Sequence, residues 1–77
     1  MAIQLKDKEF GRFFKRLGQR IRQLRTQKGM TQEDMLSYGF STRHYQRIEA
    51  GLSINVKTAL RLCKIFEISL SELFEDF

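Results

Sequence analysis

The sequence has 77 residues, of which 42% are hydrophobic and 30% are charged, and it carries a formal net charge of +5 and one cysteine. This length fits one small domain, and the hydrophobic content is too high for a disordered chain. One cysteine supports neither an internal disulfide nor a structural zinc site with its usual four ligands. No apolar run approaches the ~20 residues that a membrane span needs, so we expect a cytoplasmic protein without a membrane partner.

The positive charge is concentrated at one end of the chain. Nine of the fourteen Lys and Arg residues lie in the first 28 positions, together with only two acids, Asp7 and Glu9. The last eleven residues contain four acids and no Lys or Arg. This asymmetry indicates a protein that presents one face to a polyanion and keeps the other face away from it.

Hydrophobic periodicity predicts a long first helix over residues 7–28. Its apolar residues recur at intervals of three and four, as on one face of a helix; they are Phe10, Phe13, Phe14, Leu17, Ile21 and Leu24. Asp7 is a candidate N-cap, and Gly29 is placed to end the helix. Because glycine costs ~1 kcal/mol inside a helix, we expect the helix to begin late or bend at Gly11.

Two short helices follow, separated by Gly39 and Phe40. The first covers residues 32–38, with Thr31 as its N-cap. The second opens at Ser41 as N-cap and ends before Gly51. Tyr45 and Ile48 form its buried pair. Two short helices joined by a tight turn over residues 31–50 are typical of a helix-turn-helix, whose second helix enters the major groove of DNA.

Two further helices complete an all-α prediction. Asn55 caps the fourth, whose expected apolar stripe is Val56, Leu60, Leu62 (or Ala59), Cys63 and Phe66. The fifth begins with a capping box at residues 69–72, followed by Leu73, Phe74 and Phe77. No segment alternates between apolar and polar residues with a period of two, so no strands are expected.

Several stretches resemble the Cro/repressor-type (XRE-type) helix-turn-helix family: LGQRIRQLR (17–25), GMTQE (29–33), GFS (39–41), IEAG (48–51), TALRLCKIF (58–66) and ISLSELF (68–74). The resemblance covers residues 17–74 and implies a compact five-helix lambda-repressor-like domain. Residues 1–77 then form one domain in which residues 1–16 extend the first helix. The interval from Gln32 to Gly39 is one residue shorter than the commonest spacing, and Met35 or Leu36 replaces a small alanine, so we expect altered packing of the second helix.

The resemblance implies that the third helix is the recognition helix. Since Tyr45 and Ile48 face the core, the candidate base-reading residues are Thr42, Arg43, His44, Gln46 and Arg47. Arg43 and Arg47 could each bind guanine through two hydrogen bonds, and Gln46 suits adenine. Each of these side chains is equally able to contact phosphate.

Four residues are candidates for phosphate contact in the resembling family's pattern: Gln32, Ser41, Asn55 and Lys57. Capping alone explains Ser41 and Asn55 equally well. The resemblance also implies a partly buried ion pair between Arg25 and Glu49, which would fix the orientation of the recognition helix.

We therefore expect a sequence-specific regulator that binds double-stranded DNA as a homodimer. The candidate dimer surface is the last helix, through Leu70, Leu73, Phe74 and Phe77, and the second candidate is the Phe-rich N-terminal end. No catalytic constellation, cofactor motif, metal site or small-molecule ligand is indicated. The alternative is a small helical protein-interaction module, antitoxin-like or repressor-binding.

Overall fold

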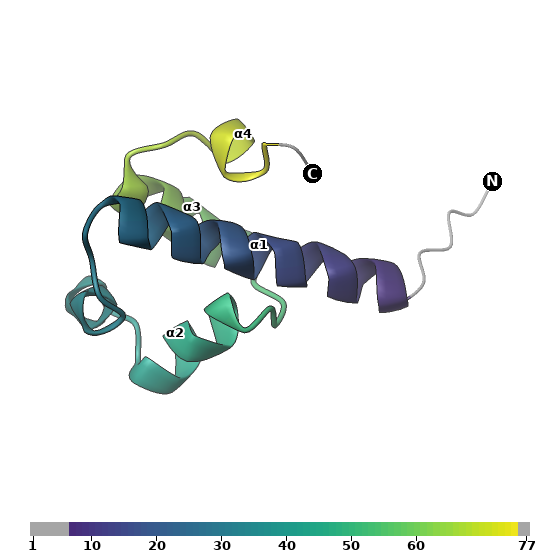
Figure 1. Cartoon of the computed structure of the whole chain (residues 1–77), viewed down its shortest axis with the longest axis horizontal. Coiled ribbons are helices and arrows are strands. Elements are labelled where there is room, and N and C mark those ends of the chain that lie inside the picture. The colour runs from purple at the N-terminus through teal and green to yellow at the C-terminus, as the bar shows by residue number, and fades with distance from the viewer. Residues whose placement is uncertain (1–6, 76–77) are drawn as a thin grey trace.

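Helix α1 (Asp7–Gln27) is the longest element, and α2 and α4 pack against it (Figure 1). The computed structural model describes residues 7–75. After α1 come the 3-10 helix η1 (Glu33–Tyr38), α2 (Thr42–Glu49), α3 (Val56–Phe66) and α4 (Leu70–Leu73). No strand occurs among these described residues, so the predicted all-α, five-helix fold is confirmed.

The core lies between α1, α2, α3 and α4. Its central members are fully or almost fully buried: Leu17, Ile21, Met35, Tyr45, Leu62 and Leu73. Helix α1 contacts α2 and α4, and α4 also packs against α3 (Figure 1). In residues 7–75 no helix has the length and apolar character required to cross a membrane.

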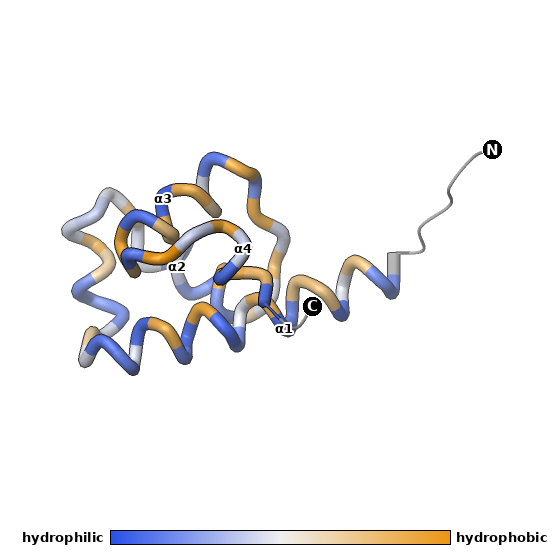
Figure 2. The backbone as a smooth tube through the Cα atoms, turned by 90° about the horizontal axis from the view of Figure 1, so that it is seen from above, coloured by the Kyte–Doolittle hydropathy of each residue, from blue (hydrophilic) through white to orange (hydrophobic). Residues whose placement is uncertain are grey.

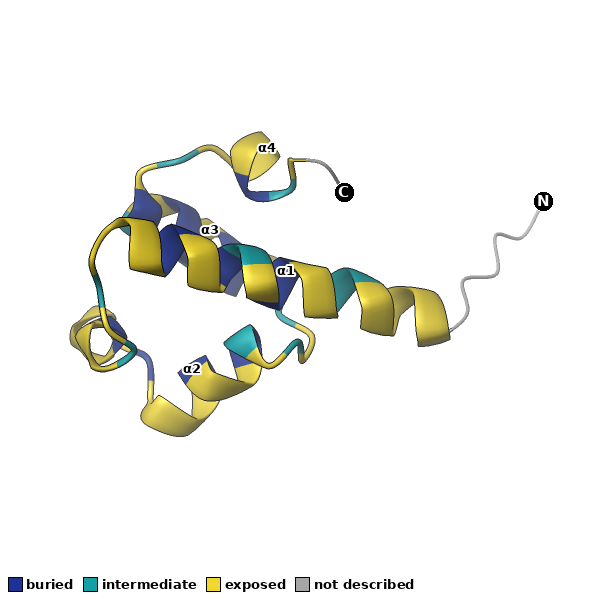
Figure 3. Cartoon of the chain, in the orientation of Figure 1, coloured by how far each residue is buried: buried dark blue, intermediate teal, exposed yellow. Residues whose placement is uncertain are grey.

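The N-terminal part of α1 projects beyond the core, and its residues are mostly exposed (Figure 3). Phe10 is 45% exposed, whereas Phe13 and Phe14 are half-buried against the core. The helix runs through Gly11 as an α-helix from Asp7, so it does not begin late at Gly11 as expected. The predicted cap by the Asp7 side chain and the predicted role of Phe77 lie outside what the structure describes.

Element η1 differs in type from the predicted short α-helix. Its hydrogen bonds join residues three apart, as from the Gly39 N–H to the Leu36 carbonyl oxygen at 3.1 Å. A 3-10 helix rises about 2.0 Å per residue against 1.5 Å in an α-helix, so it spans a given distance with fewer residues. This offsets the missing residue between Gln32 and Gly39. It also directs the bulky Met35 fully into the core.

Thr31 makes the capping hydrogen bonds predicted for it, although η1 itself begins at Glu33, one residue later than predicted. The Asp34 N–H donates to the Thr31 hydroxyl at 3.2 Å, and the Thr31 N–H donates to the Asp34 carboxylate at 2.7 Å. This reciprocal pair has the arrangement of a capping box, with Asp in the place of Glu.

The apolar stripe of α3 is rotated from the predicted one. Val56 is 69% exposed and Leu60 is 52% exposed, so neither lies in the core as expected. The buried side of the helix consists of Thr58, Ala59, Leu62, Cys63 and Phe66. The buried apolar residues recur at intervals of three, one and three residues: Ala59, Leu62, Cys63 and Phe66. These positions share one side of the helix, and Val56 and Leu60 lie outside it. Both residues therefore face solvent.

Helices α1 and α2 approach each other closely at Gly18. A methyl group at this position would lie 2.7 Å from the carbonyl oxygens of Ile48 and Glu49, which belong to the backbone and cannot move aside as a flexible side chain would. Gly11, in the same helix, has no atom within 4 Å of the corresponding point. The glycine at position 18 is thus required by packing against α2.

We expect Gly18→Ala to lower the free energy of unfolding by about 1–3 kcal/mol, because the overpacking outweighs the gain in helix propensity. Gly11→Ala is the matched control and should raise it by about 0.5–1 kcal/mol. Urea unfolding of the two variants measures both effects. Equal stabilisation by the two substitutions would contradict the close approach.

Candidate nucleic-acid interface

Helix α2 is an eight-residue amphipathic helix with a defined start. The Ser41 hydroxyl accepts a hydrogen bond from the His44 N–H at 3.1 Å, which confirms Ser41 as the N-cap. Tyr45 and Ile48, one turn apart, are 1% and 2% exposed and anchor the helix in the core. The opposite face therefore consists entirely of polar side chains.

All five residues suggested as base readers are exposed: Thr42, Arg43, His44, Gln46 and Arg47. Because Tyr45 and Ile48 define the inner face, the 3.6-residue period places Arg43 at the centre of the outer face, flanked by Gln46 and Arg47. Thr42 and Gln46 line an open hollow of about 810 Å³ between η1 and α2. The His44 ring lies at the edge, 5.6 Å from the Phe40 ring.

The predicted ion pair between Arg25 and Glu49 joins α1 to the C-terminal end of α2. The Arg25 Nε donates to Glu49 Oε2 at 2.6 Å, and Nη2 donates to Oε1 at 3.2 Å. The two side chains are only 10% and 5% exposed. A bidentate guanidinium–carboxylate pair fixes both distance and orientation. The pair therefore sets how α2 lies against α1.

Two further groups complete this cluster. The remaining nitrogen of the Arg25 guanidinium group, Nη1, donates a hydrogen bond to the Met30 carbonyl oxygen at 2.7 Å. The Gln32 amide Nε2 donates to Glu49 Oε1 at 3.2 Å. The cluster thus ties the segment before η1 to both α1 and α2. The contact with the Met30 carbonyl could not be predicted from the sequence, because a backbone acceptor has no residue-type signature.

The protonation of this cluster follows from its environment. Burial by itself raises the pKa of Glu49, but the hydrogen bonds from Arg25 and Gln32 outweigh it, and the pKa lies below its ordinary value. The hydrogen bond to Glu49 raises the pKa of Arg25 further. Burial also raises the pKa of the neighbouring Tyr45. All three groups keep their ordinary charge at neutral pH.

A helix-turn-helix family model matches residues 21–73, which include η1, α2 and the whole ion-pair cluster. The chain belongs to the XRE-type helix-turn-helix family. Family membership makes it a DNA-binding helix-turn-helix regulator, with η1 and α2 as the two helices of the motif. No curated protein sequence and no solved structure is significantly similar to it.

In this XRE-type chain, three of the suggested phosphate-contacting residues already hold part of the fold. The Ser41 hydroxyl caps α2, and the Asn55 Oδ1 caps α3 by accepting from the Thr58 N–H at 2.8 Å. Gln32 binds Glu49, and the Lys57 side chain is exposed at the start of α3. Ser41 and Asn55 use acceptor atoms for capping, so their donor groups remain available to a phosphate.

The residues suggested for dimerisation divide into distinct environments. Leu73 is 0% exposed, because it fills the core between α4 and α1, so it offers no surface to a second copy. Leu70 is 40% exposed, and Phe74 is half-buried against the Phe13 ring with centroids 5.7 Å apart. The prediction that Leu73 lies on a dimer surface was wrong, because this side chain is buried where the four-residue helix α4 packs on the core.

Two contacts that support the interface were not anticipated from the sequence. The Arg61 guanidinium of α3 lies over the Phe40 ring, 5.3 Å from its centroid, and Phe40 occupies the turn between η1 and α2. Arg20 of α1 donates to the Glu72 carbonyl oxygen at 3.1 Å and lies 3.8 Å from the Glu75 carboxylate. The first contact steadies the turn, and the second holds α4 on α1.

We expect Arg25→Met to lower the free energy of unfolding by about 3–5 kcal/mol, because it leaves the buried Glu49 carboxylate without its partner. Lys28→Met is the matched control. It removes an exposed pair with Glu67 at 3.3 Å, so the loss should be at most about 1 kcal/mol. Chemical unfolding measures both variants, and similar losses would contradict an organising role for the Arg25–Glu49 pair.

The lowered pKa of Glu49 predicts a loss of stability in acid. The pair contributes fully above about pH 4.5, the ordinary value for this carboxyl group, and the contribution declines as the pH falls toward the lower folded-state pKa. Thermal unfolding of the wild type and Glu49→Gln between pH 3 and pH 7 tests this. The difference between the two proteins should shrink below about pH 4.5, and a constant difference would contradict the assignment.

Proposed function

We propose that the chain is a sequence-specific regulator that binds a two-half-site operator in double-stranded DNA as a homodimer. The single observation that supports this most directly is the outer face of α2. Arg43, Gln46 and Arg47 are exposed there, on a helix whose inner face is anchored by Tyr45 and Ile48. Exposed arginine and glutamine side chains on a rigid helix are the groups that read base edges in the major groove.

Arg43 is the principal base-reading residue in this proposal. It lies at the centre of the outer face and near the N-terminal end of α2, the part of a recognition helix that approaches the base edges. Its guanidinium can donate two hydrogen bonds to guanine O6 and N7. Gln46 and Arg47, one turn further along, would read neighbouring positions. Thr42 and His44, at the edges of the face, complete the set.

Phosphate contacts would orient this helix on the duplex. Ser41, Asn55 and Gln32 each retain an O–H or N–H donor beyond their bonds within the fold, and Lys57 supplies a positive charge. Contacts of this kind position a protein without carrying sequence information. The net charge of +5 supports the same partner, since the Arg25–Glu49 pair is neutral and takes up none of it.

Two copies are proposed because one helix of eight residues contacts only a few base pairs. A twofold pair would place two recognition helices in successive major grooves, about 34 Å apart.

Selection of preferred sequences from a random DNA library, followed by binding at several salt concentrations, tests the proposal. We expect a symmetric or nearly symmetric site whose half-sites are one helical turn apart. The logarithm of the binding constant should fall linearly with the logarithm of salt concentration, with a slope of about 0.9 per phosphate contacted. Binding without sequence preference or salt dependence would contradict the proposal and favour a protein-interaction module.

Substitution of a base-reading residue and substitution of a phosphate-contacting residue should have different effects on DNA binding. Arg43→Ala should relax preference at one or two base positions, by about 1–3 kcal/mol each. Lys57→Ala should weaken binding to all sequences by a similar factor and reduce the salt slope by about 1. Lys64→Ala removes an exposed cation from the last turn of α3, at the other end of the helix from Lys57; it is the charge-matched control and should change neither. Unchanged specificity in Arg43→Ala would contradict the assignment of the reading face.

A further inference from the structure

Three cations form a stripe along the N-terminal half of α1. Lys8, Arg12 and Lys15 follow one another at intervals of four and three residues, which places them on one side of the helix. All three are exposed, and none of them is ion-paired to a side chain that the structure describes in residues 8–75. Hydrophilic and hydrophobic residues alternate along this part of the backbone (Figure 2). These three residues, here called the basic stripe, therefore offer their charges to an external anion.

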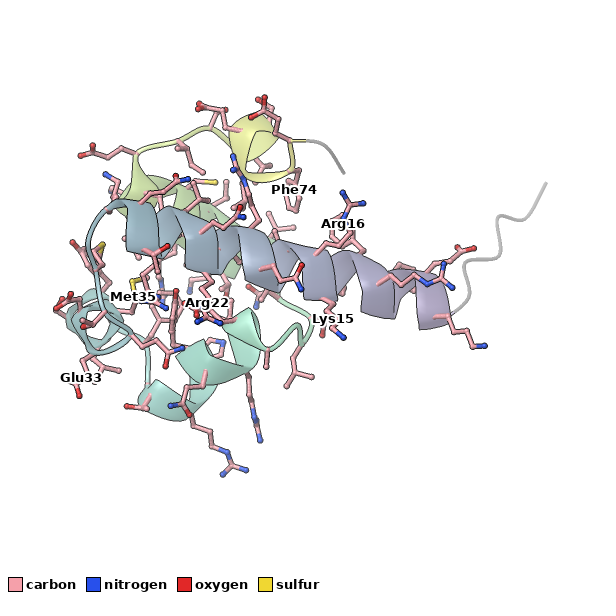
Figure 4. The ribbon with its side chains drawn as sticks, in the orientation of Figure 1. Lys15, Arg16, Arg22, Glu33, Met35 and Phe74 are labelled. Carbon is pink, nitrogen blue, oxygen red and sulfur yellow. The ribbon has the colours of Figure 1, made fainter. Side chains whose placement is uncertain are left out.

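The basic stripe lies on the same side of α1 as α2. Gly18 contacts the α2 backbone and follows Lys15 by one helical turn, so the two residues lie on neighbouring parts of one side. The Lys15 side chain projects from α1 on the side of α2, whereas Arg16 projects on the side of α4 (Figure 4). A methyl group on Gly51 would lie 2.8 Å from the Lys15 Cα atom, so α1 touches the turn that follows α2. The basic stripe therefore begins beside the C-terminal end of α2 and continues along the projecting part of α1 (Figure 1).

The stability of α1 does not account for these charges. Like charges three or four residues apart face each other on a helix and repel, as Lys8 does with Arg12 and Arg12 with Lys15. Lys8 also lies in the first turn, where the positive end of the helix dipole disfavours a cation. The arrangement therefore opposes folding, and a bound polyanion would remove the repulsion.

The depth of the major groove brings a DNA strand toward the basic stripe when α2 reads the bases. The inner face of α2 packs on the core, so α1 lies behind α2 and farther than α2 from the base edges. The major groove is about 8.5 Å deep, so the phosphates at its rim stand well above those edges, toward the elements behind a recognition helix. From Lys8 to Lys15 the helix rises about 10 Å, and one DNA strand carries a phosphate about every 3.4 Å. Three cations over this length match about three successive phosphates.

We infer that the basic stripe is a second DNA-binding element, which holds the phosphates of one strand beside the base pairs at the C-terminal end of α2. Ser41, proposed above for phosphate contact, lies at the N-terminal end of the same helix. Phosphate contacts at both ends would fix the angle at which α2 enters the groove. This inference deepens the proposed function and rests on it, because it requires α2 to face the major groove.

The apolar side of the same helix favours DNA over a membrane surface as the anion. A helix that lies on a membrane inserts its apolar face among the lipids. Phe13 and Phe14 are half-buried against the core, so most of the apolar face of this part of α1 is already occupied within the chain. The basic stripe is therefore available to an anion that needs no apolar insertion.

The salt dependence of DNA binding by the full chain tests the inference, measured by fluorescence anisotropy with a random-sequence duplex of about 30 base pairs. Lys15→Gln should lower the slope of the logarithm of the binding constant against the logarithm of salt concentration by about 0.9, and the triple variant Lys8→Gln/Arg12→Gln/Lys15→Gln by about 2.7. Arg16→Gln is the matched control, because it removes the same charge one residue further along, on the side of α4, and it should change the slope by less than about 0.3. Glutamine is a good helix former, so the variants should keep the fold, which circular dichroism checks.

The slope separates a phosphate contact from a structural role, since a loss of stability alone would leave it unchanged. An unchanged slope in the triple variant would overturn the inference, and so would equal losses in Lys15→Gln and Arg16→Gln. Loss of binding to phosphatidylserine vesicles by the triple variant, with an unchanged slope on DNA, would overturn it in favour of a membrane. A lowered slope supports the inference even if the wild type selects no preferred sequence, a result that would contradict only the proposed function. Conversely, an unchanged slope beside a sequence preference that depends on Arg43 would contradict only the inference.

Discussion

The buried pair of Arg25 and Glu49 is the constraint on which the orientation of the outer face of α2 depends. Its three hydrogen bonds from Arg25 and one from Gln32 connect α1, the segment before η1 and the end of α2. Apolar packing of Tyr45 and Ile48 keeps α2 on the core, but the hydrophobic effect is non-directional. A bidentate charged pair is directional, so it selects one orientation of α2. The positions of Arg43 and Gln46 follow from that orientation.

Much of the fold was predictable from the sequence because it depends on local signals. The caps at Ser41, Asn55 and Ser69 are confirmed, and each is encoded within three residues of its partner. The left-handed glycines 29, 39 and 51 mark the ends of their segments in the same way. The ion pair was predictable only through the family resemblance, since its partners are 24 residues apart.

The errors share one physical cause, which is that an apolar residue does not specify what it packs against. Leu62, Cys63 and Phe66 lie in the core as predicted, whereas Val56 and Leu60, which fit the same helical stripe, are exposed. Leu73 has the same residue type as Leu70, and only the docking of α4 decides that one is buried and the other is exposed. The base-reading and phosphate-contacting roles stay predictions, because the exposure of a side chain shows that it can reach a ligand but does not identify that ligand.

Helix α1 has a consequence for the architecture of a DNA complex. It is about 31 Å long at 1.5 Å per residue, runs without interruption through Gly11, and contacts α2 on one side and α4 on the other. Because α1 is one continuous helix, the positions of α2 and α4 are fixed relative to one another. A partner that binds the exposed N-terminal part of α1 would therefore be held in a defined orientation relative to the outer face of α2.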